Sequence, residues 1–521
     1  MMRILLLAAL LIPAVAAAQN PHAAAPEAPP RSTPDQTPDK TTTHTLALPG
    51  RTLSFTATVS TIRLFSPQGA AQADVVVTAF QRTGAGERPV TFVLNGGPGS
   101  ASAWLNLGAL GPWRIPFDGT IQPSMRPALV ENAETWLDFT DLVFIDPVTT
   151  GYSRVLGGDD VRRRMLSVDG DIETLATVVR RWVEANDRLL SPKFIAGESY
   201  GGFRGPRLAR ALLDEQGIGV RGLMLISPVL DFNGRDAPWD PMRWVARLPS
   251  LVATARGATG RAELRDAEDY AATDYLIDLV RGEHDAAAVA RVSTRVAALT
   301  GLDPGLVRRR AGKVDLGTFV RDREPGRVAS PYDATVGAVD PFPTAANDNS
   351  PDAILDGLRG PITSAMLDML SRRLEWTGGS APGRRYTLLA ESTAREWEYG
   401  RGNARPESMT ALRQYLALDP AARVLVTHGL ADLVTPYFAS KLLLDQIPDA
   451  AGGDRAQLRV YGGGHMYYSR DRSRAAMHAD AEAMVRAALA PSAADAAGSG
   501  TPPPAPTPPP APAQPSVPAI R

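Results

Sequence analysis

Gly197-Glu198-Ser199-Tyr200-Gly201 is the stretch of this chain that decides its fold. The pattern Gly-x-Ser-x-Gly is typical of a sharp strand-to-helix turn that presents a serine, where a Cβ at either flanking position would clash. Residues 193–196 form a short apolar run that suits a buried strand, and residues 207–213 have helical periodicity. A glycine-rich chain of this length contains such a pattern by chance in roughly one case in four, so an ordinary glycine turn stays open at this point.

The wider pattern of the chain indicates an α/β fold. Alternating segments at 53–59 and 73–80 predict antiparallel strands. Continuous apolar runs typical of parallel strands follow at 90–94, 142–145, 194–196 and 222–226, with a helical stretch at 172–190. Helical segments dominate after residue 233, and strand signals return at 424–427 and 458–461. We therefore predict a mostly parallel central sheet with a largely helical insertion, the cap. Two independent domains are the alternative.

These changes in composition define six segments. We expect a signal peptide at 1–18, a disordered linker at 19–43, and the first part of an α/β core at 44–233. The cap insertion follows at 234–401, the second part of the core at 402–491, and a disordered proline-rich tail at 492–521. A positive residue, an apolar run and small residues before Gln19 are typical of a cleaved export signal. The expected location is therefore periplasmic or secreted.

Charge and cysteine content exclude several classes of function. The chain has 521 residues, 55 Lys and Arg against 56 Asp and Glu, and a net charge of −1. We expect no nucleic-acid partner, because no basic excess is present. Cysteine is absent, which excludes disulfides and thiolate metal sites. We expect no metal or organic cofactor and no stable membrane insertion, and the oligomeric state stays open.

A serine nucleophile needs a histidine base that is oriented by a carboxylate. In this type of fold the order along the chain is serine, then the acid, then histidine, with the last two on loops after late strands. His465 is the best of the six histidines, because it follows an apolar strand within Tyr461-Gly462-Gly463-Gly464-His465. His428 precedes the acid candidate and is interpreted as a structural residue, whereas His478 is interpreted as a surface residue.

Asp432 is the acid candidate, because it follows the strand at 424–427 and precedes His465. Asp146 competes with it, since it also follows a predicted strand, but it precedes Ser199 and would break the order. Donors for an oxyanion are also needed, usually the amide after the serine and one from an early strand-to-helix loop. The loop at 95–100, Asn-Gly-Gly-Pro-Gly-Ser, follows the strand at 90–94 and suits this role.

Four motifs in this order resemble the serine carboxypeptidases of the α/β-hydrolase superfamily, in their bacterial form. They are Asn95-Gly96-Gly97-Pro98-Gly99-Ser100, Phe144-Ile145-Asp146-Pro147 running to Gly151-Tyr152-Ser153, Gly197-Glu198-Ser199-Tyr200-Gly201-Gly202, and Gly464-His465-Met466. The resemblance implies that Ser199 is the nucleophile, His465 the base and Asp432 its orienter. It further implies an oxyanion hole from the amides of Gly97 and Tyr200. Asn95, the amide of Gly96, and Glu198 would hold the terminal carboxylate of a peptide substrate.

The chain departs from this family at position 109. Many relatives carry a second glutamate in a Glu-Leu-Gly-Pro segment, which here is Ala109-Leu110-Gly111-Pro112. Without that partner the pKa of Glu198 should rise less, and activity should extend closer to neutral pH. The resemblance implies release of C-terminal residues from peptides through an acyl-enzyme. Acyl transfer or ester hydrolysis with the same triad is the alternative, and an inactive binding protein is a third.

Overall fold

The computed structural model describes residues 36–490, except 85–86, 118–121, 234–236, 238, 346–349, 381–382 and 401–404. The predicted signal peptide at 1–18 and the predicted tail at 492–521 lie outside the described residues. The linker predicted at 19–43 is wrong at its end, because β1 already begins at Lys40 (Lys40–Leu48). Thr41 pairs with Thr58 of the next strand. Threonine favours strands, so these residues join the sheet despite their linker-like composition.

A single large sheet forms the centre of the fold. Within the described residues its strand order is β1-β2-β3-β7-β4-β9-β10-β13-β14, with β8 paired to β3. The segment from β7 to β14 is parallel, while β1, β2 and β3 are antiparallel and β3 pairs antiparallel with β7. The remaining bounds are Arg51–Phe65 (β2), Ala71–Arg82 (β3), Val90–Leu94 (β4), Asp141–Ile145 (β7), Arg154–Val155 (β8), Lys193–Glu198 (β9), Gly222–Ile226 (β10), Arg423–Gly429 (β13) and Ala456–Tyr461 (β14). The predicted α/β-hydrolase fold class is confirmed by this sheet and its helices.

Alternate residues of each parallel strand enter opposite hydrophobic cores. In β4, Phe92 belongs to the core that contains helices α3, α4 and α13, whereas Val93 belongs to the core that contains α1, α11 and α15. Successive side chains of a strand point to opposite faces, so a strand that is covered on both sides reads as a continuous apolar run. This explains why the strand signal was strong in the sequence.

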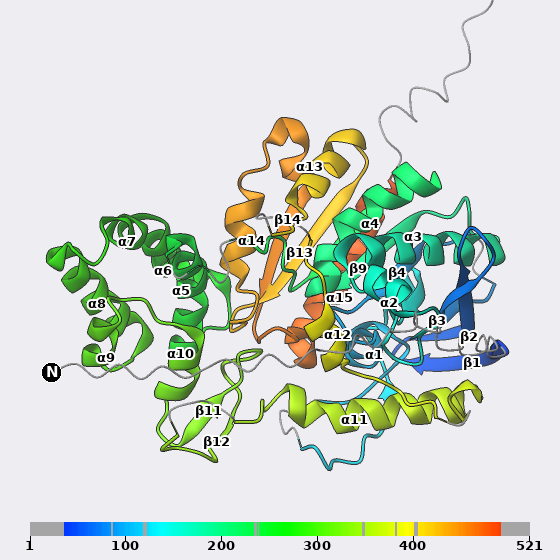
Figure 1. The fold of residues 1–521 in the computed structure, drawn as a ribbon, viewed down its shortest axis with the longest axis horizontal. Coiled ribbons are helices and arrows are strands. Elements are labelled where there is room, and N and C mark those ends of the chain that lie inside the picture. The colour runs from blue at the N-terminus through cyan, green and yellow to red at the C-terminus, as the bar shows by residue number, and fades with distance from the viewer. Residues whose placement is uncertain are drawn as a thin grey trace, which may run out of the picture. The chain divides into compact units, whose positions relative to one another are not determined.

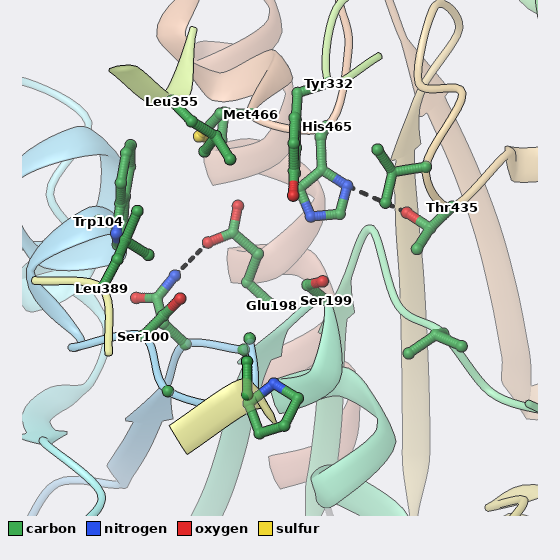
Figure 2. A pocket seen from close by; sticks show the side chains of 18 of the residues that line it. Ser100, Trp104, Glu198, Ser199, Tyr332, Leu355, Leu389, Thr435, His465 and Met466 are labelled. Carbon is green, nitrogen blue, oxygen red and sulfur yellow. Dashed lines mark hydrogen bonds between the residues drawn. The ribbon is translucent and has the colours of Figure 1, made fainter. Parts of the chain in front are cut away.

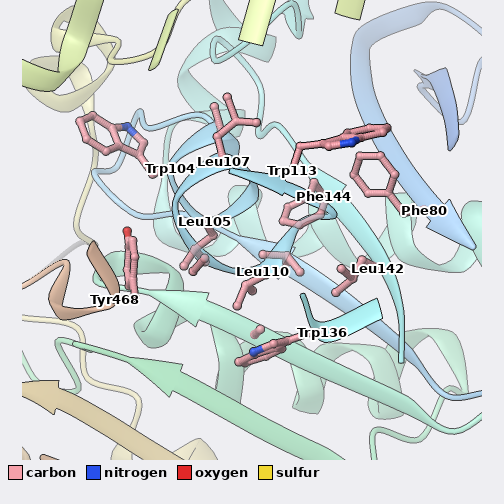
Figure 3. Packing of buried hydrophobic residues seen from close by; sticks show 14 of the residues in the cluster. Phe80, Trp104, Leu105, Leu107, Leu110, Trp113, Trp136, Leu142, Phe144 and Tyr468 are labelled. Atoms are coloured by element: carbon pink, nitrogen blue, oxygen red, sulfur yellow. The ribbon is translucent and has the colours of Figure 1, made fainter. Parts of the chain in front are cut away.

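The helices that cover the sheet are separated in the chain. On one face lie α3 (Val168–Ala185), α4 (Tyr200–Gln216) and α13 (Met409–Leu418), and on the other α1 (Ala103–Leu105), the π-helix η1 (Asn106–Leu110), α11 (Leu355–Asp368) and α15 (Asp471–Leu489). Helix α3 begins earlier than the predicted 172–190, because the Ser167 side chain accepts a hydrogen bond from the Gly170 amide and caps it. In the core that contains α1, α11 and α15, the ring centroid of Phe80 lies 6.0 Å from that of Trp113 and 5.9 Å from that of Phe144 (Figure 3).

The insertion between β10 and β13 has two parts. The first packs helices around its own apolar cluster, beside α14 (Tyr437–Leu444) (Figure 1). Its helices are α5 (Pro241–Arg256), α6 (Arg265–Tyr270), α7 (Leu276–Arg281), α8 (Ala286–Thr300), α9 (Pro304–Arg309) and α10 (Leu316–Asp322). The second part holds the hairpin β11 (Arg327–Ala329) and β12 (Gly337–Val339), then α11 and α12 (Glu391–Glu396).

Smaller elements complete the described fold. They are the hairpin β5 (Trp113–Arg114) and β6 (Val130–Glu131), the helix α2 (Asp159–Met165), the π-helices η4 (Ala271–Tyr275) and η5 (Met369–Arg373), and the 3-10 helices η2 (Trp136–Asp138), η3 (Arg261–Leu264), η6 (Gly378–Ser380), η7 (Asp449–Ala451), η8 (Gly453–Arg455) and η9 (Tyr467–Ser469). None of the helices in the described part of the chain combines the length and apolar character that a membrane span needs.

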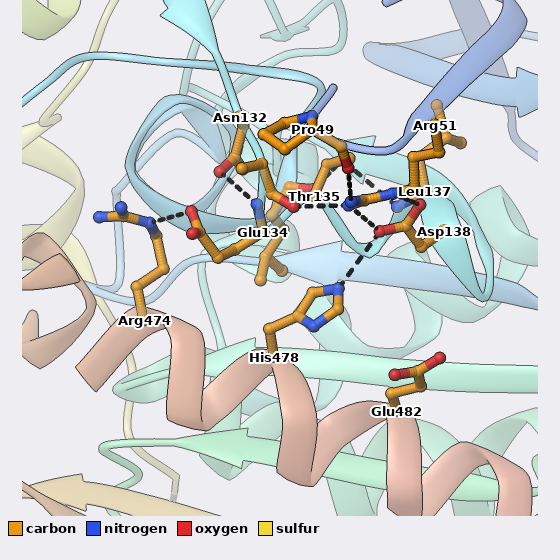
Figure 4. Close-up of polar contacts among 12 residues, drawn as sticks. Pro49, Arg51, Asn132, Glu134, Thr135, Leu137, Asp138, Arg474, His478 and Glu482 are labelled. Atoms are coloured by element: carbon orange, nitrogen blue, oxygen red, sulfur yellow. Dashed lines mark hydrogen bonds and ion pairs between the residues drawn. The ribbon is translucent and has the colours of Figure 1, made fainter. Parts of the chain in front are cut away.

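Helix α15 attaches to the segment before β7 through polar contacts (Figure 4). Arg474, which is buried, donates to Glu134 at 3.1 Å. His478 Nε2 lies 3.6 Å from a carboxylate oxygen of Asp138, and its side chain is 16% exposed. His478 is therefore half-buried against Asp138, so the sequence interpretation of it as a surface residue is wrong. The Arg- and Ala-rich sequence of α15 does not distinguish its buried face from its exposed face.

Candidate active site

Ser199 lies at the turn between β9 and α4, as the opening motif predicts. Its backbone has φ 59° and ψ −118°, a left-handed conformation that non-glycine residues rarely adopt. A Cβ at Gly197 would stand 2.1 Å from the Gly201 carbonyl oxygen, and one at Gly201 would stand 2.4 Å from that of Leu94. Both glycines are required by close backbone approach, so the turn has the backbone geometry of a nucleophile elbow.

His465 and Asp432 meet on loops that follow the last two strands. His465 Nδ1 lies 2.7 Å from Asp432 Oδ2, and both side chains are buried. The amides of Val434 and Thr435 each donate to Asp432 Oδ1 at 2.9 Å. These bonds fix the carboxylate, which in turn orients the imidazole.

Thr435 is a residue of this site that sequence reasoning missed. Its hydroxyl donates to Asp432 Oδ2 at 2.7 Å, and its oxygen lies 3.0 Å from His465 Nδ1. Ser227, after β10, donates to the His465 carbonyl oxygen at 2.7 Å. Thr435 stands in a turn that follows the acid candidate by three residues, which was the one available signal.

The insertion also supports the histidine loop. The His465 amide donates to the Tyr332 carbonyl oxygen at 2.5 Å, and the Tyr332 ring stands edge-on to the imidazole with 5.4 Å between centroids. Asp333 accepts the Gly464 amide at 3.0 Å. These contacts join segments more than a hundred residues apart, so no local sequence signal could have revealed them.

Ser199, Glu198 and His465 line one pocket of about 440 Å³ (Figure 2). The glycine-rich loop at 95–100 forms another wall of it, so the structure brings together the sequence-predicted nucleophile, base and loop. Asp432 lies behind His465 and is fully buried. The cap contributes to the lining as well, with Tyr332, Leu355, Arg359, Leu389, Ala390, Glu391 and Ala394.

The residues predicted as oxyanion donors lie on two segments that approach each other closely. Tyr200 opens α4, and the first N–H groups of a helix have no acceptor within it. A Cβ at Gly96 would stand 2.6 Å from the Tyr200 nitrogen, which places the glycine-rich loop directly against the elbow. Gly97 has φ 102°, a conformation that favours glycine. The Gly97 and Tyr200 amides can therefore converge on one oxygen beside Ser199.

Glu198 is buried beside the serine with both carboxyl oxygens hydrogen-bonded. Asn95 Nδ2 donates to Oε2, and the Tyr468 hydroxyl donates to Oε1 at 2.8 Å. Burial raises the pKa of Glu198 to about 7, although His465 and these two donors favour its charged form. The Asn95 Oδ1 atom accepts the Leu105 amide at 3.1 Å, which directs its NH₂ group at Glu198.

An ion pair under the loop supports Asn95. Arg204 donates to the Asn95 carbonyl oxygen at 2.7 Å and to both carboxylate oxygens of Asp171, at 2.6 and 3.1 Å. Arg204 and Asp171 are each about 2% exposed or less. Neither was singled out from the sequence, because the pair joins two helices whose charged residues resemble ordinary surface positions.

The alternative acid and base lie away from this catalytic geometry. Asp146 accepts hydrogen bonds from the amide and the hydroxyl of Ser102, both at 2.8 Å, and burial raises its pKa to about 6. His428 is fully buried, its Nε2 lies 2.9 Å from the Ser440 hydroxyl, and burial lowers its pKa to about 4. Neither residue lines the pocket that contains Ser199.

Three aromatic residues near the site have different surroundings, which the sequence could not show. Trp104 lines the pocket with Ser199. Trp397 instead donates to the Tyr200 hydroxyl at 3.1 Å within a core. Tyr152 lines a neighbouring cavity. Within the described residues, no group of three or more His, Asp or Glu side chains could hold a metal ion.

Comparison with known proteins shows similarity to one family over part of the chain. Residues 78–248 match the model of the serine carboxypeptidase family. The chain is 29% identical over 218 residues to the pheromone-processing carboxypeptidase KEX1 of Uncinocarpus reesii, covering 40% of this chain and 31% of that protein. It is 34% identical over 138 residues to the KEX1 of Metarhizium robertsii, covering 26% of this chain and 20% of that protein. Over these residues the chain is similar to the serine carboxypeptidase family.

A solved structure is similar in fold over most of the chain. The prohormone-processing carboxypeptidase of Saccharomyces cerevisiae superposes with a TM-score of 0.53 and 15% identity, covering 83% of this chain and 91% of the other. The matches to the two curated relatives span less than a third of the length of either. The bacterial form of the family stays a prediction.

Proposed function

We propose that this chain is a serine-type carboxypeptidase that releases C-terminal residues from peptides through an acyl-enzyme intermediate. The observation that carries the proposal is that one pocket contains both a group of residues suited to cleave an acyl bond and a group suited to bind a carboxylate. Ser199 and the His465–Asp432 pair can cleave an acyl bond. Glu198 and Asn95, on the same wall, can bind a terminal carboxylate.

The proposed reaction uses the chain's own groups at every step. His465 removes the proton of Ser199 Oγ as the oxygen attacks the last peptide carbonyl, and the amides of Gly97 and Tyr200 stabilise the oxyanion. His465 then gives that proton to the leaving amine, which departs as the free C-terminal residue. Water, deprotonated by His465, attacks the acyl-enzyme ester, and the bond to Ser199 Oγ breaks. His465 returns the proton to Oγ, and the shortened peptide leaves with a new terminal carboxyl group.

The terminal carboxylate would bind through hydrogen bonds to Asn95, the Gly96 amide, and Glu198. A carboxyl group donates to a carboxylate only when it is protonated, and burial raises the pKa of Glu198 to about 7. Glu198 is then mostly protonated below neutral pH, which makes recognition of a free C-terminus effective in acidic to neutral solution. Burial supplies this effect in the absence of a carboxyl side chain at Ala109.

The position of Glu198 between Ser199 and an apolar wall of the pocket favours substrates with apolar C-terminal residues. Figure 2 shows Trp104 and Leu389 on the side of Glu198 that faces away from Ser199. A terminal carboxylate held at Glu198 would direct the last side chain toward this apolar wall, which Leu355 and Met466 extend. We propose that large apolar residues are the preferred C-terminal residues.

Three matched substrates test the proposal: a blocked dipeptide, its C-terminal amide, and a simple ester of the same acyl group. Much higher kcat/KM for the free carboxylate supports the carboxypeptidase. Equal rates on peptide and amide, with fast ester cleavage, would favour an esterase or acyltransferase. Hydrolysis of none of the three would favour a binding protein.

Ser199→Ala tests the nucleophile. We expect kcat/KM to fall by a factor of about 10³ or more, because an acyl-enzyme can no longer form. Ser392→Ala, at an exposed serine of α12, is the control and should retain normal rates. A serine-reactive phosphonate should label the peptide that contains Ser199, and activity that survives Ser199→Ala would refute the mechanism.

Export is part of the proposal. The composition of residues 1–18 supports cleavage before Gln19 and a periplasmic or secreted mature protein. N-terminal sequencing of protein from cell fractions tests it. We expect an N-terminus at Gln19 in the exported fraction, and a chain that keeps Met1 inside the cell would contradict export.

A further inference from the structure

Tyr468 contacts the proposed carboxylate-binding group, although no motif pointed to it. It lies in η9, three residues after His465, and is 2% exposed. Its hydroxyl donates to Glu198 Oε1 at 2.8 Å across a sequence separation of 270 residues. Glu198 is thus held from two sides, because Asn95 Nδ2 donates to Oε2.

The Tyr468 ring is fixed by the π-helix that contains Ala109. A Cβ at Gly108 would stand 2.8 Å from Tyr468 Cε2, so the ring rests on this glycine. Figure 3 shows Tyr468 beside Trp104 and Leu105 in the same apolar layer. Ala109, also fully buried, offers no polar side-chain atom to Glu198. The hydroxyl that donates to Glu198 therefore comes from Tyr468 in η9, and not from the helix that contains Ala109.

We propose that Tyr468 is a positioning residue for substrate recognition, whose hydroxyl orients the Glu198 carboxyl toward the terminal carboxylate of the peptide. This inference rests on the proposed carboxypeptidase function. The Tyr468 hydroxyl contacts Oε1 and the Asn95 NH₂ group contacts Oε2, so the two contacts together fix the plane of the Glu198 carboxyl. The remaining N–H of Asn95 and the O–H of a protonated Glu198 can then bind one carboxylate together.

The same bond affects the pH range of recognition. The groups that act on Glu198 come from separate elements: His465 and Asp432 from two loops, Tyr467 and Tyr468 from η9. Burial raises the pKa of Glu198, whereas His465 and the hydrogen bonds from Tyr468 and Asn95 lower it. Removing the Tyr468 hydroxyl removes one donor to the ionised form, so Glu198 should stay protonated to higher pH.

Tyr468→Phe separates orientation from folding, because it removes one oxygen and keeps the ring. With a free-carboxylate dipeptide at pH 6, we expect KM to rise about fivefold and kcat to change less than twofold, since the hydroxyl no longer orients the protonated Glu198 carboxyl. The alkaline limb of kcat/KM should move up by about one pH unit. The ester should show neither change, because it carries no terminal carboxylate.

Tyr467→Phe is the matched control. Tyr467 is the preceding residue and is equally buried, but its hydroxyl donates to Thr427 at 2.6 Å and not to Glu198. Its pH profile on the dipeptide should match that of the wild type. Tyr468→Phe profiles that superpose on the wild type, or an equal loss on the ester, would overturn the positioning role.

A titration without turnover distinguishes this inference from the proposed function. Carbon-13 NMR of glutamate carboxyls in Ser199→Ala protein, with Glu198 assigned by its loss in Glu198→Gln, reports its ionisation directly. We expect the Glu198 midpoint to rise by about one pH unit on adding Tyr468→Phe. An unmoved midpoint refutes the Tyr468 bond whatever the activity. A moved midpoint in an enzyme that ignores the free carboxylate instead refutes the carboxypeptidase function.

Discussion

Glu198→Gln tests the proposal that the buried carboxyl of Glu198 recognises the terminal carboxylate of a peptide. The measured quantity is the ratio of kcat/KM for a blocked dipeptide to that for its C-terminal amide. Burial raises the pKa of Glu198 to about 7. The protonated fraction is then about 90% at pH 6, about 10% at pH 8 and about 1% at pH 9. Because only the protonated carboxyl can donate to a carboxylate, the wild-type ratio should fall almost a hundredfold from pH 6 to pH 9.

The glutamine variant removes this dependence and keeps a donor. An amide NH₂ group does not ionise in this range, so the ratio should be flat from pH 6 to pH 9. Steady-state kinetics at four pH values measure it, and the use of a ratio cancels the titration of His465, which acts on both substrates. Glu391→Gln is the control, since this exposed carboxylate lines the same pocket and pairs with Arg359 at 3.0 Å. A wild-type ratio that stays constant with pH would refute the assignment of Glu198.

Three further outcomes follow from buried groups around the site. Asp171→Asn should lower the free energy of unfolding by about 3–5 kcal/mol in urea denaturation, because it leaves the buried Arg204 without its carboxylate, and a loss below about 1 kcal/mol would contradict this. Asp146 has a folded pKa raised to about 6 from 3.8, so the folded state binds the proton more tightly; its contribution to the unfolding free energy should fall by about 2 kcal/mol as pH rises from 4 to 6, and Asp146→Asn should remove that part of the pH dependence. Trp104→Ala should raise KM about tenfold for peptides ending in Leu or Phe and leave those ending in Gly unchanged, and equal effects on both would refute the apolar wall.

Most of the sheet was predictable because its strands are covered on both faces. The predicted segments at 90–94 and 222–226 coincide with β4 and β10. Errors occurred at chain segments whose composition is ambiguous. The threonines at 41–43 have the composition of a linker, and they form a strand because they pair with β2. Helix α3 starts four residues earlier than its apolar pattern suggested.

The candidate site was predictable where function leaves a local mark. Ser199 and His465 stand among glycines at strand ends, and Asp432 follows a strand in the expected order. The supporting residues carry no such mark. Thr435 and Tyr332 resemble ordinary loop residues in the sequence, and only their contacts with the histidine and its acid reveal a role.

The sequence by itself determined which side chains are candidates for the proposed chemistry and in which order they come, because a sharp turn between strand and helix demands particular residues locally. The tertiary structure decided the environment of those side chains. The raised pKa of Glu198 depends on complete burial, and its second donor, Tyr468, comes from 270 residues away. Burial and long-range hydrogen bonds arise only when distant segments pack together, and no local pattern encodes them.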